Sequence, residues 1–251
     1  MSRFGLIGYP LSHSKSKVFF EELFALKELQ GYSYENIPLA SEAEVIDFMK
    51  HGGSFRGLNV TSPYKRLAFQ LCDALSDEAL ATGSVNCIHF DSGRSKGYNT
   101  DVYGFIKSIE QFLYQPNDMS ALILGSGGAA SAAFYGLGLM GIRSKVIGRG
   151  PNNFFSHGYA DLSEEELSSY HIIINATPLG TWPNVNAFPP IPYEAIHSRQ
   201  VLFDMVYNPA VTAFMRYGMA AGCRVKNGSE MLHLQAMKSW EIWSENIEKD
   251  L

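Results

Sequence analysis

The chain has 251 residues, 46% of them hydrophobic, and a formal net charge of −5. This length accommodates one large or two modest domains, and the apolar content is sufficient for buried cores. The charge is mild and no block of like charges occurs, which argues against a nucleic-acid-binding protein with a basic face.

The sequence shows no targeting or metal-binding signal. The apolar run from Phe4 to Ile7 is far too short for a signal peptide or a membrane span. Cys72, Cys87 and Cys223 have no CxxC or Cys/His spacing of the kind that holds a metal. We therefore expect reduced thiols, no metal, no membrane attachment and a cytoplasmic location.

The first hundred residues alternate between strand and helix patterns. A strand over 4–7 leads to a turn and then to a helix that Ser14 or Ser16 caps and that Gly31 stops. The capping box Ser41–Glu44 opens a second helix, which ends at Gly52-Gly53. Further strands are predicted at residues 32–39, 55–61 and 85–90, the last with a hairpin partner ending near residue 98, and a helix at 75–81. This alternation predicts a mainly parallel sheet.

Lys65 lies at an electrostatically unusual position. Ser62-Pro63 is expected to start a helix, with serine as the cap and proline in the first turn, and Lys65 falls in that same turn. The positive end of the helix dipole disfavours a cation there. A misplaced charge often has a ligand, although a lone surface lysine is ordinarily only solvated.

The centre of the chain contains an apolar run that breaks into glycines, Ala121–Ala130. It reads as strand, tight turn and helix. Gly125 allows the turn, Gly127 lets backbone N–H groups approach a pyrophosphate at the helix N-terminus, and Gly128–Ala130 allow close helix packing. A strand at 143–148 completes a βαβ unit, which favours dinucleotide binding over a plain strand-to-helix turn.

The rest of the chain continues the α/β pattern. Strands are predicted at 171–174, 200–206 and 223–228, and a loop at 150–153. Helices are predicted at 210–221 and from 229 to the end, with a short helix that opens at Ser163–Glu166. The helix capped by Asn99-Thr-Asp101 and the residues 116–118 form the expected hinge. We predict two α/β domains, 1–100 completed by the helix at about 229–251, and a dinucleotide-binding domain over 101–228.

Seven polar side chains of the first half lie where predicted strands give way to turns or helices, or close beside such points. Hydroxyl groups can hold a carboxylate, asparagines can hold hydroxyl groups, and a lysine with a carboxylate can handle a proton. They are Ser14, Ser16, Asn59, Thr61, Lys65, Asn86 and Asp101. With the dinucleotide turn, this set indicates a cleft where a cofactor and a small substrate meet.

Eight short motifs match one family in order along the chain. They are Gly8-Tyr-Pro-Leu-Ser-His-Ser-Lys-Ser16, Asn59-Val-Thr-Ser-Pro-Tyr-Lys65, Gly83-Ser-Val-Asn86, Asn99-Thr-Asp101, Gly125-Ser-Gly-Gly-Ala129, Asn175-Ala-Thr177, Asp204-Met-Val-Tyr207 and Gly228…Gln235. Together they closely resemble the motif series of the shikimate dehydrogenase family, which includes shikimate/quinate dehydrogenases. Eight matches in sequence are far more specific than any one of them.

The resemblance implies an oxidoreductase that reversibly reduces 3-dehydroshikimate to shikimate with NADPH, in the pathway to chorismate and aromatic amino acids. It also implies an N-terminal α/β substrate-binding domain with a mainly parallel sheet and a C-terminal Rossmann-type domain. Lys65 and Asp101 would be the catalytic pair.

The same resemblance assigns the other site residues. Ser14 and Ser16 would hold the substrate carboxylate, and the remaining substrate residues, which face its hydroxyl groups or line the site, would be Asn59, Thr61, Asn86, Tyr207 and Gln235. The cofactor-binding residues would be Gly125, Ser126, Gly127, Gly128, Ala129, Arg149, Thr177, Met205 and Gly228, with Met205 and Gly228 beside the nicotinamide.

Arg149 bears on the choice of cofactor. It follows the second strand of the nucleotide domain, where an arginine can pair with the 2′-phosphate of NADP and an acid would favour NAD. We expect NADP rather than NAD, with weaker discrimination than is usual in the family because residues 152–155 supply no second cation. The alternatives are an NAD-using quinate/shikimate dehydrogenase, a one-carbon folate dehydrogenase, and a non-catalytic dinucleotide-binding regulator; a monomer and a homodimer both stay open.

Overall fold

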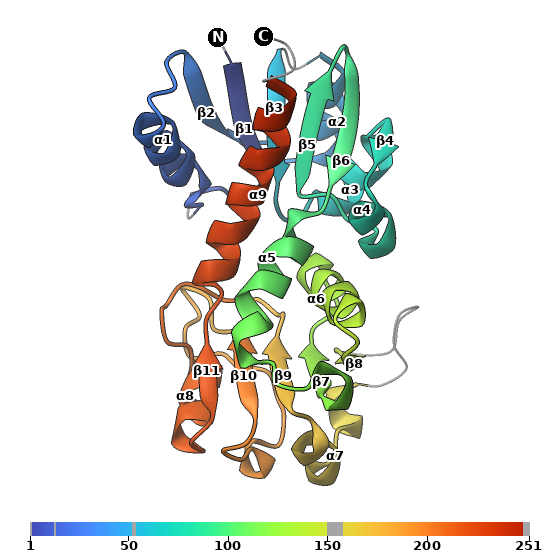
Figure 1. Ribbon diagram of the computed structural model, residues 1–251, viewed down its shortest axis with the longest axis vertical. Coiled ribbons are helices and arrows are strands. Elements are labelled where there is room, and N and C mark those ends of the chain that lie inside the picture. Colours follow the sequence, from blue (N-terminus) through green and yellow to red (C-terminus); the bar gives the residue numbers. More distant parts are fainter. Residues whose placement is uncertain (1, 13, 52–53, 150–157, 248–251) are drawn as a thin grey trace. The chain divides into compact units, whose positions relative to one another are not determined.

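The computed structural model describes residues 2–12, 14–51, 54–149 and 158–247 (Figure 1). The chain divides into two compact units, unit 1 with residues 1–100 and 236–251, and unit 2 with residues 101–235. The helix end expected at Gly52-Gly53 and the loop expected at 150–153 lie outside the described residues.

Unit 1 is built on a six-stranded mixed sheet. Its strands, in the spatial order β2-β1-β3-β5-β6-β4, are β1 (Ser2–Gly8), β2 (Tyr32–Pro38), β3 (Phe55–Val60), β4 (Ala74–Leu75), β5 (Cys87–Asp91) and β6 (Arg94–Tyr98). β1 is parallel to β2 and β3, and β4 is parallel to β6, but β5 runs antiparallel to β3 and β6. The amino end of β5 therefore lies at the edge where β1, β3 and β6 have their carboxyl ends, and we call this the unit 1 edge.

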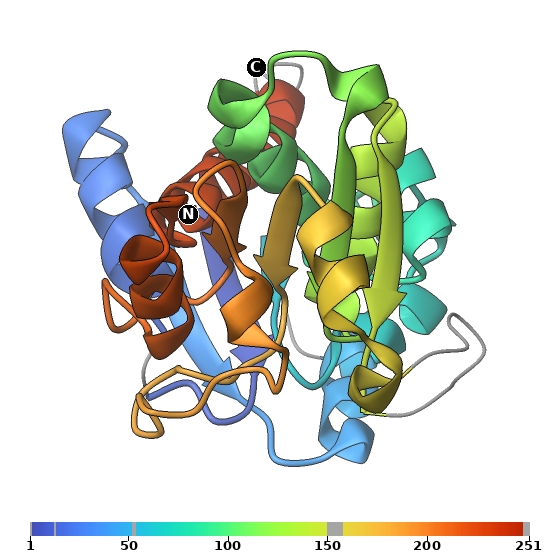
Figure 2. The same ribbon diagram turned by 90° about the horizontal axis from the view of Figure 1, so that it is seen from below.

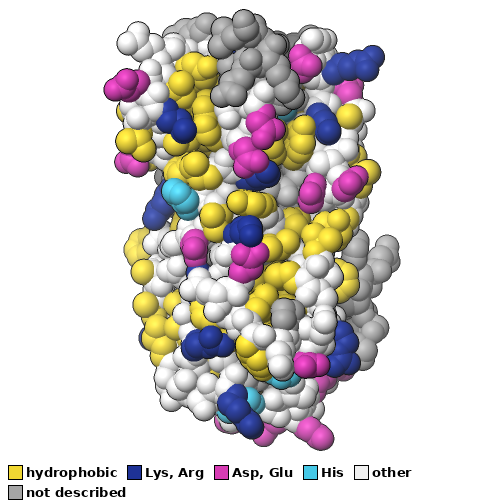
Figure 3. Space-filling model, in the orientation of Figure 1, with side chains coloured by type: hydrophobic (Ala, Val, Ile, Leu, Met, Phe, Trp, Pro, Cys, Tyr) yellow, Lys and Arg dark blue, Asp and Glu magenta, His cyan; other side chains and the backbone are white. Residues whose placement is uncertain are grey.

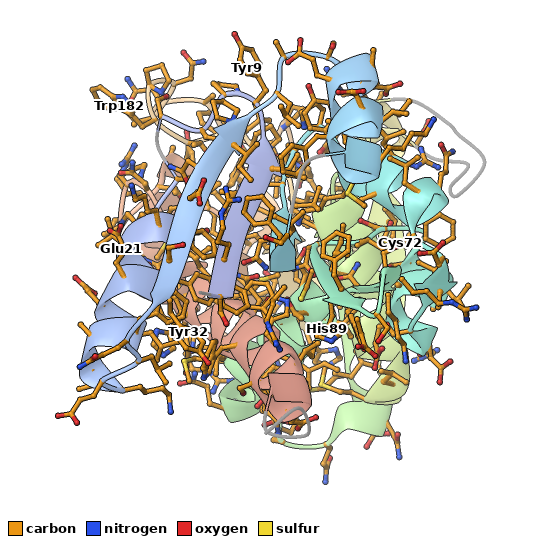
Figure 4. All side chains as sticks on the ribbon, turned by 90° about the horizontal axis from the view of Figure 1, so that it is seen from above. Tyr9, Glu21, Tyr32, Cys72, His89 and Trp182 are labelled. Carbon is orange, nitrogen blue, oxygen red and sulfur yellow. The ribbon has the colours of Figure 1, made fainter. Side chains whose placement is uncertain are left out.

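Helices cover both faces of this sheet. On one face lie α1 (Ser16–Leu26) and the part of α9 (Ser229–Ile247) that belongs to unit 1, and on the other α2 (Glu42–His51), α3 (Lys65–Leu71) and α4 (Asp77–Thr82). Figure 4 looks onto this unit, with Tyr32 beside α9. The Tyr32 ring meets the Trp240 ring edge-on, with centroids 6.1 Å apart. A Cβ atom at Gly57 would overlap the indole of Trp243, so this glycine allows α9 to pack directly on the sheet.

Two helices of unit 1 differ from their predicted limits. α3 begins at Lys65 rather than at Ser62, because residues 61–64 form a turn closed by the Tyr64 N–H on the Thr61 carbonyl at 3.0 Å. α1 ends at Leu26 rather than near Gln30. Glu28 has a φ of +54°, and the Leu29 N–H donates to the Phe24 carbonyl at 3.0 Å, a closing motif that stops the helix before Gly31.

Unit 2 has a five-stranded sheet in which every pair of neighbours is parallel. In the spatial order β11-β10-β9-β7-β8, its strands are β7 (Ser120–Leu124), β8 (Arg143–Ile147), β9 (Ile172–Asn175), β10 (Val201–Asp204) and β11 (Arg224–Lys226). The strand order reverses at β7, which has β8 on one side and β9 on the other. This is a Rossmann-type arrangement, and it confirms the βαβ unit predicted around the glycine-rich turn.

Helices lie on both faces of the unit 2 sheet (Figure 2). α5 (Thr100–Ile109) and α6 (Gly128–Leu139) pack on one face, and α7 (Glu164–Ser169) and α8 (Ala213–Ala220) on the other. Short 3₁₀ turns cover Glu110–Phe112, Pro116–Asp118, Tyr159–Asp161 and Tyr193–Ala195. Burial on both faces explains why strands such as Ile172–Asn175 read as apolar runs.

The long helix α9 is shared by the two units, which divide it after Gln235. Its first turns belong to unit 2 because Met231 is buried in the same cluster as Phe105 of α5. A Cβ atom at Gly104 would lie 2.7 Å from the Met231 carbonyl oxygen, so the two backbones touch there. The division differs from the predicted domain limit at about residue 229.

The remaining features concern the charged surface, the length of the helices and the state of the cysteines. Acidic and basic side chains are interspersed on the face that Figure 3 shows. None of the helices among the described residues combines the length and the apolar composition that crossing a membrane requires. Cys72, Cys87 and Cys223 are free thiols, and burial raises the pKa of Cys72 and of Cys87 to about 12.

Candidate functional site

The loops that follow β1 and β3 are packed together at the unit 1 edge. A Cβ atom at Gly8 would overlap the Thr61 side chain and lie 2.8 Å from Leu11 Cδ2. The Thr61 N–H donates to the Ile7 carbonyl at 2.9 Å. The absence of a side chain at position 8 thus brings Thr61 and the loop that carries Ser14 to one place.

Ser14 and Ser16 are half-buried at this edge, but neither is the cap of α1. The N-cap position is Lys15, which makes no side-chain cap bond, and the Ser14 hydroxyl accepts the Ser16 N–H at 3.3 Å. The prediction of a serine cap is therefore wrong by one residue, because the chain enters the helix from a turn whose donors Ser14 already satisfies.

Lys65 is the first residue of α3 and is half-buried. Its carbonyl accepts the Val85 N–H at 3.0 Å, which ties the helix start to the residue before Asn86. The preceding residue, Tyr64, is buried and donates its hydroxyl to the Leu39 carbonyl at 2.6 Å. The structure thus confirms a cation at the positive end of a helix, the unfavourable position that the sequence indicated.

A buried network of neutral groups lies behind these loops. The Asn59 amide donates to the Asn86 carbonyl at 3.2 Å and to the Ser239 hydroxyl at 2.9 Å, and its oxygen accepts the Tyr34 hydroxyl at 2.8 Å. Asn59 is 6% exposed. Burial raises the pKa of Tyr34 well above its ordinary value, and a hydrogen bond with Ser16 opposes that rise. Because its amide serves three protein partners, Asn59 fits a positioning role better than the predicted substrate contact.

Asn86 caps α5 from a distance. Its side-chain oxygen accepts the Thr100 N–H at 2.7 Å, and its amide donates to the Thr100 hydroxyl at 2.9 Å. Asn99, predicted as part of the cap, donates instead to Ser84 and to Thr82, at 3.0 and 2.8 Å. The expected helix start is confirmed, but the capping residue comes from the strand region before β5.

Asp101 is the second residue of α5 and is 8% exposed. A carboxylate in the first turn interacts favourably with the helix dipole, whereas Lys65 occupies the corresponding position of α3 against it. The bonds from Asn86 to Thr100 fix the start of α5 directly before Asp101. Unit 1 ends at Thr100, and Asp101 is the first residue of unit 2.

In unit 2, the residues predicted to bind the cofactor follow the carboxyl ends of parallel strands, an edge we call the unit 2 edge. Gly125, after β7, has a φ of +116°, and a Cβ atom there would lie 3.0 Å from the Ala176 carbonyl and from Thr177 Cγ2. Arg149, after β8, is exposed. The turn at Gly125 therefore needs a glycine for backbone reasons and touches the loop after β9.

Gly127 has a different reason to be glycine. It is the N-cap of α6 with a φ of −87°, and a Cβ atom there would meet nothing within 4 Å. No side chain of the described residues caps the helix, so the N–H groups of its first turn, around Gly128 and Ala129, have no capping partner among them. Protein packing leaves this position open, and the positive end of a 12-residue helix suits a phosphate group.

Thr177 and Met205 are held by a second network, centred on Asp204. The Thr177 N–H and hydroxyl donate to the Asn175 side-chain oxygen at 3.0 and 2.6 Å, and the Asn175 amide donates to Asp204 Oδ1 at 2.9 Å. Beside it, the Gly228 N–H donates to the Val206 carbonyl at 3.1 Å. A Cβ atom at Gly228 would overlap the Met205 carbonyl, so these two predicted residues touch through their backbones.

Tyr207 and Gln235 are half-buried. Burial raises the pKa of Tyr207. Gln235 donates to the Leu232 carbonyl of its own helix at 2.8 Å. Ser126 is exposed in the glycine turn. Within the described part of the chain, no group of three or more His, Cys, Asp or Glu side chains is placed to hold a metal ion.

Sequence reasoning missed the residues that organise both edges. Ser239 and Thr212 carried no signal, since each is a lone hydroxyl far along the chain from its partners. Asp204 did carry one, because a carboxylate directly follows the buried run Val201–Phe203. It stood in a matched motif, yet it was not named as a site residue.

Known proteins are similar to this chain along nearly its whole length. A family model described as the shikimate dehydrogenase substrate binding domain matches residues 6–88. The shikimate dehydrogenase (NADP(+)) of Carboxydothermus hydrogenoformans is 34% identical over 255 residues, 96% of this chain and 90% of the relative.

Solved structures extend this similarity to the fold. A shikimate 5-dehydrogenase from Thermus thermophilus, in complex with NADP(H) and shikimate, has a TM-score of 0.84 at 29% identity, covering 98% of this chain and 94% of that one. A quinate dehydrogenase from Corynebacterium glutamicum, in complex with NAD, has a TM-score of 0.83 at 25% identity, covering 97% of this chain and 94% of that one.

Proposed function

The chain belongs to the shikimate dehydrogenase family, and we propose that it catalyses the reversible NADP-dependent reduction of 3-dehydroshikimate to shikimate. The observation that carries the proposal is the match to an NADP-dependent relative over 96% of the chain. Such an enzyme serves the pathway to chorismate and aromatic amino acids. The cytoplasmic location and the choice between monomer and homodimer stay predictions.

In this proposal unit 1 supplies the substrate site. The hydroxyls of Ser14 and Ser16 bind the substrate carboxylate, and Thr61 and Asn86 bind its ring hydroxyls. The packing of the loops after β1 and β3 around Gly8 supports this role for Ser14 and Thr61. Asn86 lies at the same edge because it directly precedes β5, which runs antiparallel to β3. The family resemblance also assigns Tyr207 and Gln235 to the substrate.

Lys65 and Asp101 handle the proton. The carbonyl oxygen of the substrate gains negative charge as its carbon is reduced, and Lys65 Nζ stabilises the charge where it develops. Asp101 shares the proton and orients the alcohol in the reverse direction. The placement of a half-buried lysine against a helix dipole supports this role for Lys65.

The unit 2 edge fits a dinucleotide. The open space at Gly127 and the uncapped first turn of α6 suit the pyrophosphate, and exposed Arg149 suits a 2′-phosphate. Thr177, Met205 and Gly228 line the nicotinamide side. When bound there, NADPH supplies the hydride for the reduction.

Absorbance at the reduced-nicotinamide band, with shikimate and either cofactor, tests reaction, substrate and cofactor together. Lys65→Ala should lower kcat at least about 100-fold and leave shikimate affinity within a few-fold, because the lysine acts on charge that develops during the reaction. Lys96→Ala, an exposed lysine on β6, is the control and should leave kcat unchanged. An unchanged kcat in Lys65→Ala would remove Lys65 from the mechanism.

A second candidate is a quinate/shikimate dehydrogenase that uses NAD. The similarity to an NAD-bound quinate dehydrogenase and the single cation at Arg149 favour it. The values of kcat/KM for quinate and shikimate with NAD and NADP decide between the two. A clear preference for NAD would remove Arg149 from 2′-phosphate recognition.

A further inference from the structure

Asp204 is a buried carboxylate that is held by neutral donors. Its side chain is completely inaccessible to solvent, and it accepts the Thr212 hydroxyl at 2.5 Å, the Asn175 amide at 2.9 Å and the Val206 N–H at 3.0 Å. Among the described residues no lysine, arginine or histidine forms an ion pair with it. Burial raises its pKa to about 6. Burying a carboxylate costs free energy. The three hydrogen bonds offset part of this cost, and a neutral amide, with a single acceptor oxygen, could not accept all three in the same way.

The three donors come from three places along the chain. Asn175 ends β9 and orients Thr177, because its oxygen accepts both the N–H and the hydroxyl of that residue. Val206 lies in the loop after β10, next to Met205. Thr212 is the N-cap of α8 and accepts the Met215 N–H at 3.2 Å.

The same carboxylate therefore joins two loops at the unit 2 edge. The loop after β9 carries Thr177, whose hydroxyl also accepts the Leu179 N–H at 3.2 Å. The loop after β10 carries Met205, whose carbonyl lies against Gly228. The Met205 N–H also donates to the Asn175 carbonyl at 2.9 Å, so the backbone joins the two loops directly. Asp204 adds the side-chain bonds that orient the Asn175 amide and the Val206 N–H between them.

We propose that Asp204 is a positioning residue for the cofactor, which holds Thr177 and Met205 in one arrangement through Asn175 and Val206. This inference rests on the function proposed above, because it takes Thr177 and Met205 as part of the nicotinamide side of the cofactor site. Asp204 itself is enclosed by protein, so we assign it no direct contact with the cofactor.

The test compares Asp204→Asn with the unchanged protein. Asn keeps the volume of the side chain but replaces one acceptor oxygen with a donor, so the Thr212 and Asn175 bonds can no longer both form. We expect the Kd for NADPH, measured by fluorescence, to rise about tenfold, and the Kd for adenosine 2′,5′-bisphosphate to stay within twofold, because that probe lacks the nicotinamide half. Far-UV circular dichroism and thermal unfolding verify that the variant is folded.

Two further variants separate positioning from general stability. Glu166→Gln removes a half-buried carboxylate of α7 that pairs with Lys145, and it should lower the melting temperature without changing the Kd for NADPH. Thr212→Ser keeps the donor hydroxyl and should retain the Kd of the unchanged protein, whereas Thr212→Val should weaken NADPH binding in the same direction as Asp204→Asn.

The outcomes are distinct. If the unchanged protein binds no NADPH and does not oxidise shikimate, the proposed function fails. If the unchanged protein does both and Asp204→Asn leaves both affinities unaltered, the positioning role is wrong. An equal loss of affinity for NADPH and for adenosine 2′,5′-bisphosphate would also overturn it, since a loosened unit 2 weakens both.

Discussion

The loops at the unit 1 edge are held by neutral groups, whereas those at the unit 2 edge are held by an ionisable one. Asn59 joins its neighbours with an amide, which donates twice and accepts once. Asp204 joins its neighbours with a carboxylate, which accepts three times. Both side chains lie at or next to the end of a strand and are nearly or wholly inaccessible to solvent.

The choice of an amide at one edge and a carboxylate at the other follows from the hydrogen-bond donors and acceptors that surround each side chain. At the unit 1 edge a carbonyl and a serine hydroxyl take donors while a tyrosine hydroxyl takes an acceptor, and the amide of Asn59 offers two donors and an acceptor at once. At the unit 2 edge the partners are a backbone N–H, a hydroxyl and an amide N–H, which all donate. A carboxylate satisfies them at the cost of a buried charge. The stability of the first network should therefore be independent of pH, and that of the second should not be.

The largest expected effect is that of removing the amide. Asn59→Leu leaves the Tyr34 hydroxyl, the Asn86 carbonyl and the Ser239 hydroxyl without that partner. The Asn86 carbonyl keeps the Val60 N–H at 2.8 Å, and the Ser239 hydroxyl keeps its bond with the Thr100 hydroxyl. Each of the three lost hydrogen bonds contributes about 1 kcal/mol, so the free energy of unfolding should fall by about 3 kcal/mol. Urea unfolding measures it. Asn36→Leu, at an exposed position of β2, is the control and should change it by less than about 0.5 kcal/mol. Equal effects of the two variants would mean that the network does not stabilise the unit.

The pH dependence of Asp204 should be nearly as large. Its pKa is raised by burial from 3.8 to about 6, so the group favours folding most below pH 4, and this contribution is lost as the pH rises through about 6. Since one pKa unit corresponds to about 1.4 kcal/mol, the loss by pH 7 is about 3 kcal/mol. Tyr193, whose own pKa Asp204 raises, titrates far above this range.

The measurement is the difference in free energy of unfolding between the unchanged protein and Asp204→Asn, from pH 4.5 to 7.5. This difference should shift against the unchanged protein by about 2–3 kcal/mol as the pH rises, because only the carboxylate ionises. The corresponding difference for Asn59→Leu should stay flat. Two flat profiles would contradict the contrast between the edges.

The smallest expected effect concerns the glycine turn. Gly127→Ala meets no obstacle in the described part of the protein, so the free energy of unfolding should change by less than about 1 kcal/mol. The Kd for NADPH should rise about tenfold if a pyrophosphate approaches that backbone. Gly138→Ala, at a second open position on α6, is the matched control and should leave the Kd unchanged. A normal Kd in Gly127→Ala would place the pyrophosphate elsewhere.

Much of the fold could be predicted because its signals are local. The strand at Ile172–Asn175 is a run of apolar residues, and Gly125 has the positive φ that its turn suggested. Ser41 caps α2 as expected, since its hydroxyl accepts the Glu44 N–H at 3.2 Å, while the Glu44 carboxylate accepts the Ala40 N–H at 3.0 Å. The start of α3 could not be predicted in the same way. Ser62-Pro63 has the composition of a helix start, but the turn at 61–64 takes those residues.

The residues of the candidate site also divide into those that local sequence predicts and those that only tertiary contacts identify. By itself the sequence determined which side chains follow strands, namely Thr61, Lys65, Arg149, Thr177 and Met205, because strand periodicity and turn residues are written in neighbouring positions. Only the tertiary structure decided that the antiparallel β5 brings Asn86 to the start of α5, that Ser239 meets Asn59 across 180 positions, and that Asp204 is enclosed among neutral donors. Hydrogen-bond partners of buried groups are chosen by proximity in space, and burial sets the pKa of a carboxylate, so neither can be read from residues that are adjacent in the chain.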